Sequence, residues 1–356
     1  MSSQPPVLLG PDLRGHVLDQ RYRLDALLGC GGTANVYLAA DLRLGGHPLA
    51  VKVFHPEHAR TDDQRRRIRQ EALLGARLDH PHLLPVLDLG VAAPRGGEPQ
   101  PYLALPRVDG PTLRDLILAG PLPWPRAALL VLQLLDALAA LHTLGVLHRD
   151  LKSTNCLVTR RAGRDHLILV DLGLAKVRAP AAVLSSAPRT RTGALFGTLA
   201  YLAPEQACGQ ALDERADLYA VGVVLFEAIT RRLPFTGSEY AVLRGHVEEA
   251  PPPPSTLAAA LPPELDAVVL RALAKDPAER FASAAAFADA LAAVLPATAS
   301  DRHRFTVDDP GSDAARRALA AWTRFEYASA RQAAADAAQQ SRSWSPLALL
   351  LDLLPE

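Results

Sequence analysis

Cysteine is scarce in this chain of 356 residues. It occurs three times, at Cys30, Cys156 and Cys208. An odd number of widely spaced thiols argues against a disulfide framework and predicts reduced thiols, as in a cytosolic protein. Such crosslinks are not needed for stability, because 49% of the residues are hydrophobic and the chain is long enough for one large or two medium domains.

An excess of charge and the signals for export or membrane insertion are also lacking. The formal net charge is zero and the arginines are scattered, which argues against a nucleic-acid partner. The opening MSSQPPVLLGPDLRG has no basic region followed by an apolar core. No run approaches the roughly 18 to 20 uncharged apolar residues of a membrane span. We therefore expect a soluble, cytoplasmic protein without a membrane span.

Lysine and asparagine are rare, although arginine is abundant. The lysines are Lys52, Lys152, Lys176 and Lys275, and the asparagines are Asn35 and Asn155. In a chain whose default cation is arginine, a lysine indicates a place where a compact point charge is needed. The few lysines are therefore candidates for functional sites.

Short alternating runs between about residues 20 and 56 predict three antiparallel strands. They read YRLDALLG, NVYLAAD and HPLAVKVFH. The glycine-rich stretch LGCGGTANVY, residues 28–37, lies between the first and the second of them. A dinucleotide-binding glycine loop runs from a strand into a helix, so a connection between two strands disfavours that fold.

A helix is predicted to follow these strands. Thr61 and Gln64 have the spacing of a capping box, and the helix should continue to about Arg77. Two further strand-like stretches, 83–91 and 101–108, flank the turn-forming segment APRGGEPQ. The first part of the chain therefore contains mostly strands.

The second part is mostly helical. Apolar periodicity predicts helices at about 124–145, 213–231, 263–274 and 283–294. PPPP at 251–254 is interpreted as a rigid loop between two helices, and a polyproline ligand for another domain is the alternative. The fold class is therefore α+β, with a small β-rich lobe, a larger helical lobe and a cleft where they meet.

Three motifs that are far apart in the chain carry candidate catalytic groups. LAVK contains Lys52 on the third strand, VLHRDLKSTN contains Asp150 and Asn155, and LVDLG contains Asp171 just after a strand. In this order the motifs resemble those of a bacterial, eukaryotic-like (Hanks-type) Ser/Thr protein kinase. The resemblance covers about residues 22–294 and implies a bilobal protein-kinase fold.

Domain boundaries follow from the extent of the resemblance and from a shift in composition beyond about residue 296. Residues 1–20 are an N-terminal segment, and 21–296 are the kinase domain, with an N-lobe at about 21–107 and a C-lobe at about 108–296. Residues 297–356 form a linker and a helical C-terminal extension. Docking of this extension on the preceding domain and a role in partner binding or dimerisation both remain open.

Four residues have catalytic roles by resemblance. Lys52 contacts the α- and β-phosphates of ATP and is held by Glu71. Asp150 orients the substrate hydroxyl and accepts its proton, and Lys152 neutralises the transferred phosphoryl group. The motif histidine, His148, is interpreted as a structural residue.

Mg²⁺ is the implied metal, with Mn²⁺ as an alternative. Asn155 and Asp171 are the ligands by resemblance, since Mg²⁺ prefers hard oxygen donors and takes phosphate oxygens and waters as its other ligands. The residues that would bind ATP by resemblance are Leu28, Gly29, Gly31, Val36, Ala50, Lys52, Pro106 and Val108.

The sequence departs from the family pattern at several positions. Ala34 stands at the place of the third glycine, Leu172 at that of the usual phenylalanine, and Pro106 in the segment that would bind adenine. Ser153 stands where the family usually has proline. This exchange is expected to loosen the loop without removing a catalytic group.

The segment GTLAYLAPEQ indicates a protein as the phosphoryl acceptor. By resemblance Thr198 bridges Asp150 and Lys152, and Glu205 pairs with Arg280 below a peptide substrate.

The activation loop, roughly 174–202, contains Thr190 and Thr192, which are candidate autophosphorylation sites. Arg149 would supply the cation that pairs with the phosphothreonine.

The leading hypothesis is thus an ATP- and Mg²⁺-dependent protein Ser/Thr kinase. A pseudokinase or scaffold acting through the C-terminal extension is the alternative, and activation as a homodimer is left open. A redox role for Cys30 or Cys156 is a lesser alternative to their being ordinary apolar cysteines.

Overall fold

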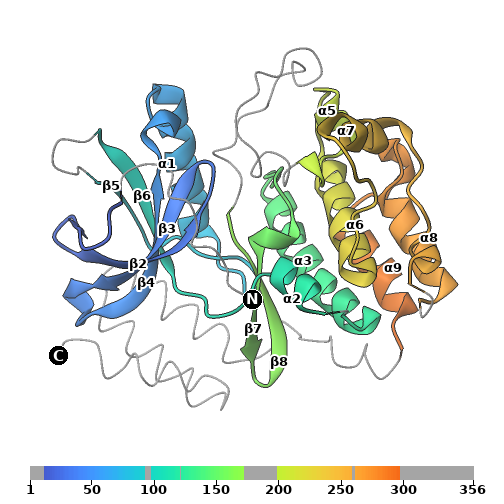
Figure 1. Cartoon of the computed structure of the whole chain (residues 1–356), viewed down its shortest axis with the longest axis horizontal. Helices are drawn as coiled ribbons and strands as arrows, with labels where there is room; N and C mark the ends of the chain where they lie inside the picture. Colours follow the sequence, from blue (N-terminus) through green and yellow to red (C-terminus); the bar gives the residue numbers. More distant parts are fainter. Residues whose placement is uncertain (1–11, 93–97, 121, 172–198, 259–260, 297–356) are drawn as a thin grey trace. The chain divides into compact units, whose positions relative to one another are not determined.

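The structure, a computed structural model, describes residues 12–92, 98–120, 122–171, 199–258 and 261–296. By its contacts the chain divides into two compact units, and all the described residues except Asp41–His47 belong to the first. In this unit a six-stranded sheet comes first in the chain, and a group of helices with a two-stranded sheet follows (Figure 1).

The six-stranded sheet has the order β1-β2-β3-β4-β6-β5. Its strands are β1 (Val17–Leu18), β2 (Tyr22–Cys30), β3 (Ala34–Asp41), β4 (His47–Phe54), β5 (Asp88–Ala92) and β6 (Gln100–Pro106). The three strands predicted between residues 20 and 56 are confirmed as β2, β3 and β4. Strand β1 was not predicted, and its antiparallel pairing with β2 means that the sheet begins before residue 21.

The strand predicted at 83–91 is too long by several residues, because β5 begins only at Asp88. Pro85 lies in the lost part, and a proline cannot donate a ladder hydrogen bond. From Asp88 onward β5 pairs with β6 in antiparallel register. The strand predicted at 101–108 is confirmed as β6.

Strand β4 is buried on both faces from Leu49 onward. Val51 and Val53 belong to one apolar cluster, while Phe54 packs in another with Ile68 of helix α1 (Asp62–Arg77). Since successive side chains of a strand point to opposite faces, Lys52 lies on the same face as Phe54. The alternation along β4 therefore directs the lysine toward α1.

Helix α1 begins where the sequence predicts. The side chain of Thr61 accepts from the backbone of Gln64, and the Gln64 side chain accepts from the backbone of Thr61, so the capping box is confirmed. The helix ends at Arg77, and it contacts β5 and β6. These contacts fix α1 on the sheet.

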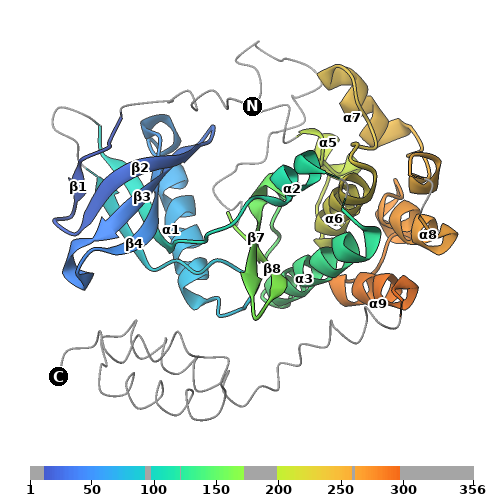
Figure 2. The same cartoon turned by 60° about the horizontal axis from the view of Figure 1, so that its bottom comes forward.

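The helical part contains seven described α-helices and a β-hairpin. They are α2 (Leu113–Ala119), α3 (Trp124–Thr143), α5 (Pro204–Ala207), α6 (Glu214–Thr230), α7 (Glu239–Glu248), α8 (Pro263–Ala272) and α9 (Ala284–Val294), with strands β7 (Cys156–Arg161) and β8 (Arg164–Leu169). The predicted helices are confirmed as α3, α6, α8 and α9, whereas α2, α5, α7 and the hairpin were not predicted. Figure 2 shows β7 and β8 near α3, and α3 contacts β8.

Short 3-10 turns complete the described part of the chain. They are η1 (Leu42–Leu44), η2 (Pro56–His58), η3 (Ser153–Asn155), η5 (Pro254–Thr256) and η6 (Pro277–Glu279). The proline run 251–254 lies between α7 and α8, as predicted, and its last proline begins η5.

Helices α3 and α6 form the centre of the helical part. Helix α6 is buried all round from Ala216 to Thr230, as expected for a helix without a polar face. Helix α3 contacts α6, α9 and β8.

Helix α3 combines length with a high hydropathy. Among the described residues it is the one helix long and apolar enough to span a membrane, with 20 residues and a mean hydropathy of 1.4 over an 18-residue stretch. In the fold, however, 56% of this apolar stretch is buried inside the protein. We interpret it as a core helix.

Candidate active site

Lys52 is held between two carboxylates from distant parts of the chain. It lies on β4 opposite Leu103 of β6 and is 7% exposed. Its Nζ is 3.0 Å from Oε1 of Glu71 on α1 and also donates to Oδ1 of Asp171. The structure thus brings together three of the residues singled out in the sequence.

The charge of Lys52 is maintained by these partners. Burial disfavours the charged ammonium, but the carboxylates of Asp171 and Glu71 outweigh this effect and raise the pKa of Lys52. The lysine therefore remains a cation at neutral pH. A fixed cation of this kind attracts phosphate oxygens.

A second group gathers around Asp150, which is 4% exposed. Nζ of Lys152 lies 3.1 Å from its Oδ2. The amide nitrogen of Asn155 donates to the backbone carbonyl of Asp150 at 2.9 Å and to its Oδ2 at 3.2 Å. One buried carboxylate is thus oriented by a cation and an amide from the same loop.

The donor types in this site fit a magnesium ion. Asn155 turns its amide nitrogen to Asp150, so its amide oxygen is the atom that remains for a metal. Asp171 has a left-handed backbone conformation, φ 67°, two residues after β8 ends. Among the described residues no cluster of three His, Cys, Asp or Glu side chains is suited to a metal, so a bound Mg²⁺ would also use phosphate oxygens and waters.

Asp217, which the sequence did not single out, fastens the segment that leads into Asp150. This carboxylate on α6 is 2% exposed and accepts from the backbone N–H groups of His148 and Arg149, each at 2.8 Å. It also lies 2.9 Å from Nε2 of His142. The available signal was an aspartate within a predominantly apolar helix, because a buried carboxylate needs several donors. His148 itself is fully buried.

The glycine-rich stretch forms the turn between β2 and β3. Within it the N–H of Gly31 donates to the carbonyl of Ala34 at 2.9 Å, and a Cβ at Gly31 would lie 3.2 Å from that oxygen. Leu28 is 52% exposed, whereas Gly29 and Val36 are half-buried. The turn connects two strands, as the sequence predicts.

Two histidines outside this turn hold its carbonyl groups. Nε2 of His55 lies 3.0 Å from the carbonyl of Gly31, and Nε2 of His58 lies 3.0 Å from that of Gly32. A carbonyl only accepts, so each ring nitrogen must carry the proton and donate. These two contacts were not predicted from the sequence, because His55 and His58 belong to no catalytic motif.

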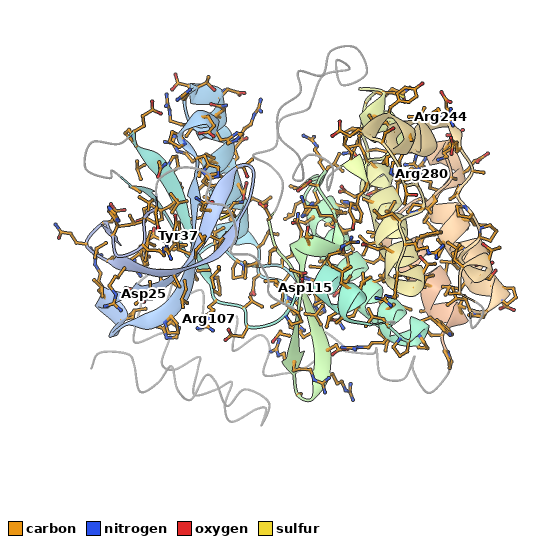
Figure 3. All side chains as sticks on the ribbon, in the orientation of Figure 1. Asp25, Tyr37, Arg107, Asp115, Arg244 and Arg280 are labelled. Carbon is orange, nitrogen blue, oxygen red and sulfur yellow. The ribbon has the colours of Figure 1, made fainter. Side chains whose placement is uncertain are left out.

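The proposed adenine-binding residues lie on neighbouring strands or just beyond them. Ala50 on β4 is 8% exposed and pairs in register with Leu105 of β6. Pro106 is the last residue of β6, and Val108 follows as a half-buried residue. Arg107, which is labelled in Figure 3, stands between them in the sequence, and its guanidinium pairs with Asp109.

Glu205 and Arg280 form a buried ion pair with Nη1–Oε1 2.7 Å and Nη2–Oε2 2.9 Å. Arg149 has a left-handed backbone, φ 66°, and an exposed side chain. The predicted phosphorylation sites Thr190 and Thr192, and also Thr198, lie outside the described residues.

Two of the cysteines can be compared. Cys156 is fully buried, and burial raises the pKa of its thiol to about 12. Cys30, at the end of β2, is half-buried. A thiol that stays protonated is a poor nucleophile, so the redox alternative loses support at Cys156.

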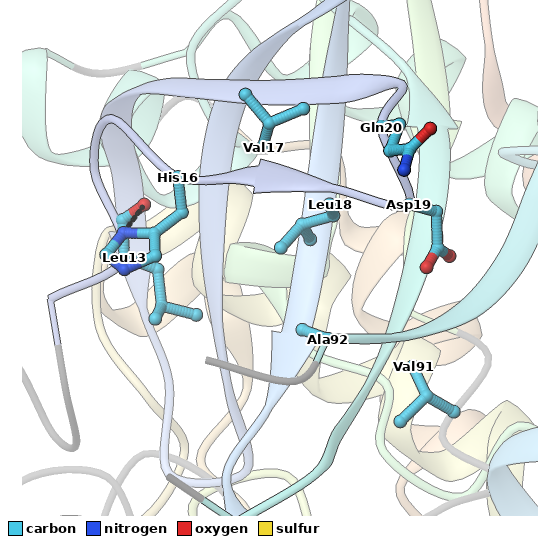
Figure 4. A pocket seen from close by; sticks show the side chains of 8 residues that line it. All are labelled: Leu13, His16, Val17, Leu18, Asp19, Gln20, Val91 and Ala92. Atoms are coloured by element: carbon cyan, nitrogen blue, oxygen red, sulfur yellow. Dashed lines mark hydrogen bonds between the residues drawn. The ribbon is translucent and has the colours of Figure 1, made fainter. Parts of the chain in front are cut away.

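A cavity of about 250 Å³ lies away from these residues, beside β1 and the end of β5 (Figure 4). Its lining residues are Leu13, His16, Val17, Leu18, Asp19, Gln20, Val91 and Ala92. None of the predicted site residues lines it. We therefore assign it no part in the chemistry of Lys52 and Asp150.

Comparisons with known proteins agree with this geometry. The family model of the protein kinase domain matches residues 22–291. Serine/threonine-protein kinase PknB of Mycolicibacterium smegmatis is 41% identical over 293 residues, covering 82% of this chain and 45% of that protein. PknB of Mycobacterium tuberculosis is 41% identical over 270 residues, covering 75% and 42%. The chain thus spans less than half the length of these relatives.

Solved structures include a similar chain. The crystal structure of a double mutant of the PknI kinase domain from Mycobacterium tuberculosis has a TM-score of 0.62 and 29% sequence identity. The match covers 81% of this chain and all of that one.

Proposed function

The chain belongs to the protein kinase family, among the bacterial Hanks-type Ser/Thr kinases, and has their bilobal α+β fold; from this we propose that it transfers the γ-phosphoryl group of ATP to Ser and Thr hydroxyls of proteins. The observation that carries the proposal is the buried lysine on β4. Lys52, held by Glu71 and Asp171, is a fixed cation beside a carboxylate suited to a metal. Moving a phosphoryl group requires such groups around a polyanion.

The side chains divide the work as follows. Lys52 contacts the α- and β-phosphates, and Glu71 holds it in place. Asp150 orients the acceptor hydroxyl and takes its proton, while Lys152, 3.1 Å from Asp150, neutralises charge on the transferred group.

ATP and Mg²⁺ are the proposed cofactors, with Mn²⁺ as an alternative metal. Asn155 and Asp171 would hold the metal, which when bound supplies positive charge to the phosphate oxygens. The backbone carbonyl of Pro106 and the N–H of Val108 would bind adenine, since Pro106 lacks only an N–H. Apolar contacts and phosphate access would come from the residues Leu28, Gly29, Gly31, Val36 and Ala50.

The protein acceptor would bind to the segment that leads into α5. The ion pair of Glu205 and Arg280 would stabilise the surface on which the acceptor peptide lies. Thr198 would bridge Asp150 and Lys152. Activation would follow autophosphorylation at Thr190 or Thr192. A phosphothreonine there can pair with the guanidinium of Arg149, which is exposed and directly precedes Asp150.

A labelling assay tests the proposal. The whole chain is incubated with radiolabelled ATP, Mg²⁺ and myelin basic protein, and the wild type is compared with Asp150→Asn and Lys52→Met. We expect incorporation into Ser and Thr only in the wild type, and phosphate on Thr190 or Thr192 by mass spectrometry. Equal incorporation by wild type and Asp150→Asn would overturn the proposal, and so would no incorporation at all, which favours the pseudokinase alternative.

The domain boundaries are part of the proposal. Residues 21–296 would form the kinase domain, preceded by 1–20, and 297–356 would be an appendage that affects turnover or dimerisation. Deleting 297–356 and measuring turnover and oligomeric state tests this role. Unchanged values for both would show that the appendage is passive.

A further inference from the structure

Ser153 lies in the loop between Asp150 and Asn155, although it is not one of the proposed catalytic residues. It is the first residue of η3, the turn that ends at Asn155, and it follows Lys152 directly. Its side chain is fully buried. A buried hydroxyl needs a hydrogen-bond partner, so this side chain must be explained by what it contacts.

The partner of Ser153 is Tyr201, 48 residues further along the chain. Oγ of Ser153 lies 2.9 Å from Oη of Tyr201, in a buried contact. Oη of Tyr201 lies 2.6 Å from Oε2 of Glu227, which as a carboxylate can only accept. The single phenolic proton is thus given to Glu227, and the serine hydroxyl must be the donor to Tyr201.

The hydrogen bonds that run from Ser153 through Tyr201 to Glu227 form a relay, and an ion pair lies at its far end. Glu227 on α6 is fully buried, and its other oxygen, Oε1, accepts from the guanidinium of Arg114 on α2. Arg114 is 35% exposed, so the relay runs from the interior to the surface. Burial raises the pKa of Tyr201, which keeps the phenol protonated and able to donate.

We propose that Ser153 is a positioning residue for the protein acceptor, because its hydroxyl fixes Tyr201 to the loop that carries Asp150. This inference rests on the proposed function, in which the segment leading into α5 receives the acceptor. Tyr201 lies three residues before α5 begins at Pro204. The hydroxyl therefore joins the place where the acceptor lies to the turn that carries Asn155.

The link depends on serine at this position. Proline, which the resemblance leads one to expect here, has no hydroxyl and could not donate to Tyr201. From the sequence alone, this exchange is expected to loosen the loop. The structure instead gives the loop an additional attachment.

Steady-state kinetics of the full chain test the proposal. We compare Ser153→Ala, Ser153→Pro, Tyr201→Phe and the double variant Ser153→Ala/Tyr201→Phe, with ATP and myelin basic protein as substrates. The loss of one hydrogen bond should raise the KM for myelin basic protein about three- to tenfold and leave the KM for ATP unchanged. The double variant should be no worse than the more affected single variant, because both remove the same contact.

Ser283→Ala is the matched control. It also removes a serine hydroxyl, the one that caps α9, but this helix is not part of the relay. It should lower the melting temperature and leave both KM values unchanged. The proposal would be overturned if Ser153→Ala left the KM for myelin basic protein unchanged, or if it raised both KM values equally. Failure of the wild type to label myelin basic protein would instead contradict the proposed function.

Discussion

The guanidinium of Arg280 and the carboxylate of Glu205 form a two-point ion pair that is almost completely buried. The two residues are 2% and 4% exposed, respectively. Arg280 also donates to the backbone carbonyls of Ala274, Arg215 and Lys275. It therefore ties α5 to the chain around α6 and after α8. Figure 3 labels Arg280 in the helical part of the structure.

Arg280→Ala should destabilise the protein strongly. The substitution leaves the carboxylate of Glu205 buried without its cation, and breaking a buried pair in this way costs about 3–5 kcal/mol. Urea unfolding followed by circular dichroism measures the loss. Arg280→Lys should recover only a part of it, because an ammonium cannot make two parallel bonds to a carboxylate.

The matched control is the exposed pair of Arg244 with Glu249. Arg244→Ala should change the free energy of unfolding far less than Arg280→Ala, since water already screens this pair. Similar losses for Arg244→Ala and Arg280→Ala would contradict the importance of burial.

The ion pair was predictable because both of its residues lie in recognisable motifs. Lys52, Asp150 and Asp171 were predictable for the same reason, because each stands in a short motif that resembles one of the kinase family. Helices such as α3 were predictable from their periodicity, and α1 also from its capping box at Thr61. Local patterns therefore account for most of the architecture.

Contacts between segments without motifs were not predictable. Ser153 and Tyr201 are 48 residues apart, and which hydroxyl faces which phenol depends on how α6 packs. The contacts of Asp217 with the backbone of His148 and Arg149 were not predictable for the same reason. Helix α5 is only four residues long, too short for a periodic signal, and β1 has two residues.

Loss of the histidine contacts to the glycine-rich turn should weaken ATP binding. His58→Ala removes the donor to the carbonyl of Gly32, so the turn should move more freely, and we expect the KM for ATP to rise about two- to tenfold. Hydrogen exchange of residues 28–37 should become faster. His55→Ala should act in the same way through Gly31.

Two comparison variants make this prediction specific. His58→Gln keeps an N–H donor and should lie closer to the wild type than His58→Ala. His47→Ala removes an exposed histidine at the start of β4 and should change neither the KM nor the exchange. If His58→Ala and His55→Ala both leave the KM for ATP unchanged, the contacts do not contribute to nucleotide binding.

Glu71→Gln should reduce turnover while the protein stays folded. The amide is nearly isosteric but lacks the charge that attracts Lys52, and Asp171 is proposed to serve a metal. A displacement of the lysine by about 1 Å can cost on the order of a hundredfold, so we expect kcat/KM to fall about ten- to a hundredfold. Single-turnover kinetics at saturating ATP measure the effect on the chemical step.

Glu264→Gln is the control for this prediction, because Glu264 is an exposed glutamate in the first turn of α8. It should retain wild-type kinetics. Wild-type turnover in Glu71→Gln would mean that Asp171 alone positions the lysine.

His246 should make stability depend on pH. Its Nε2 lies 3.1 Å from the carbonyl of Ala200 and must donate to it, and in the neutral ring Nδ1 accepts from the hydroxyl of Tyr219 at 2.9 Å. Burial, and then the charge of Lys275, lower the pKa of His246 to about 4. The ordinary value in an unfolded chain is about 6.5.

The sign follows from proton binding. Between pH 6.5 and 4 the unfolded chain binds a proton at His246 that the folded protein does not, so acid favours unfolding in this window. The contribution of the neutral ring is complete above pH 6.5 and is lost progressively as the pH falls toward 4. The shift corresponds to up to about 3 kcal/mol.

Comparison with His246→Gln isolates this residue from the many carboxylates that also titrate in acid. Glutamine keeps an N–H that can reach Ala200 but does not titrate, so the stability advantage of the wild type over the variant should shrink as the pH falls from 7 to 4.5. Urea unfolding at each pH and at constant ionic strength measures the difference. An advantage that stays constant across this range would mean that His246 takes up a proton equally in the folded and unfolded states, and then the contact with Tyr219 does not depend on a neutral ring.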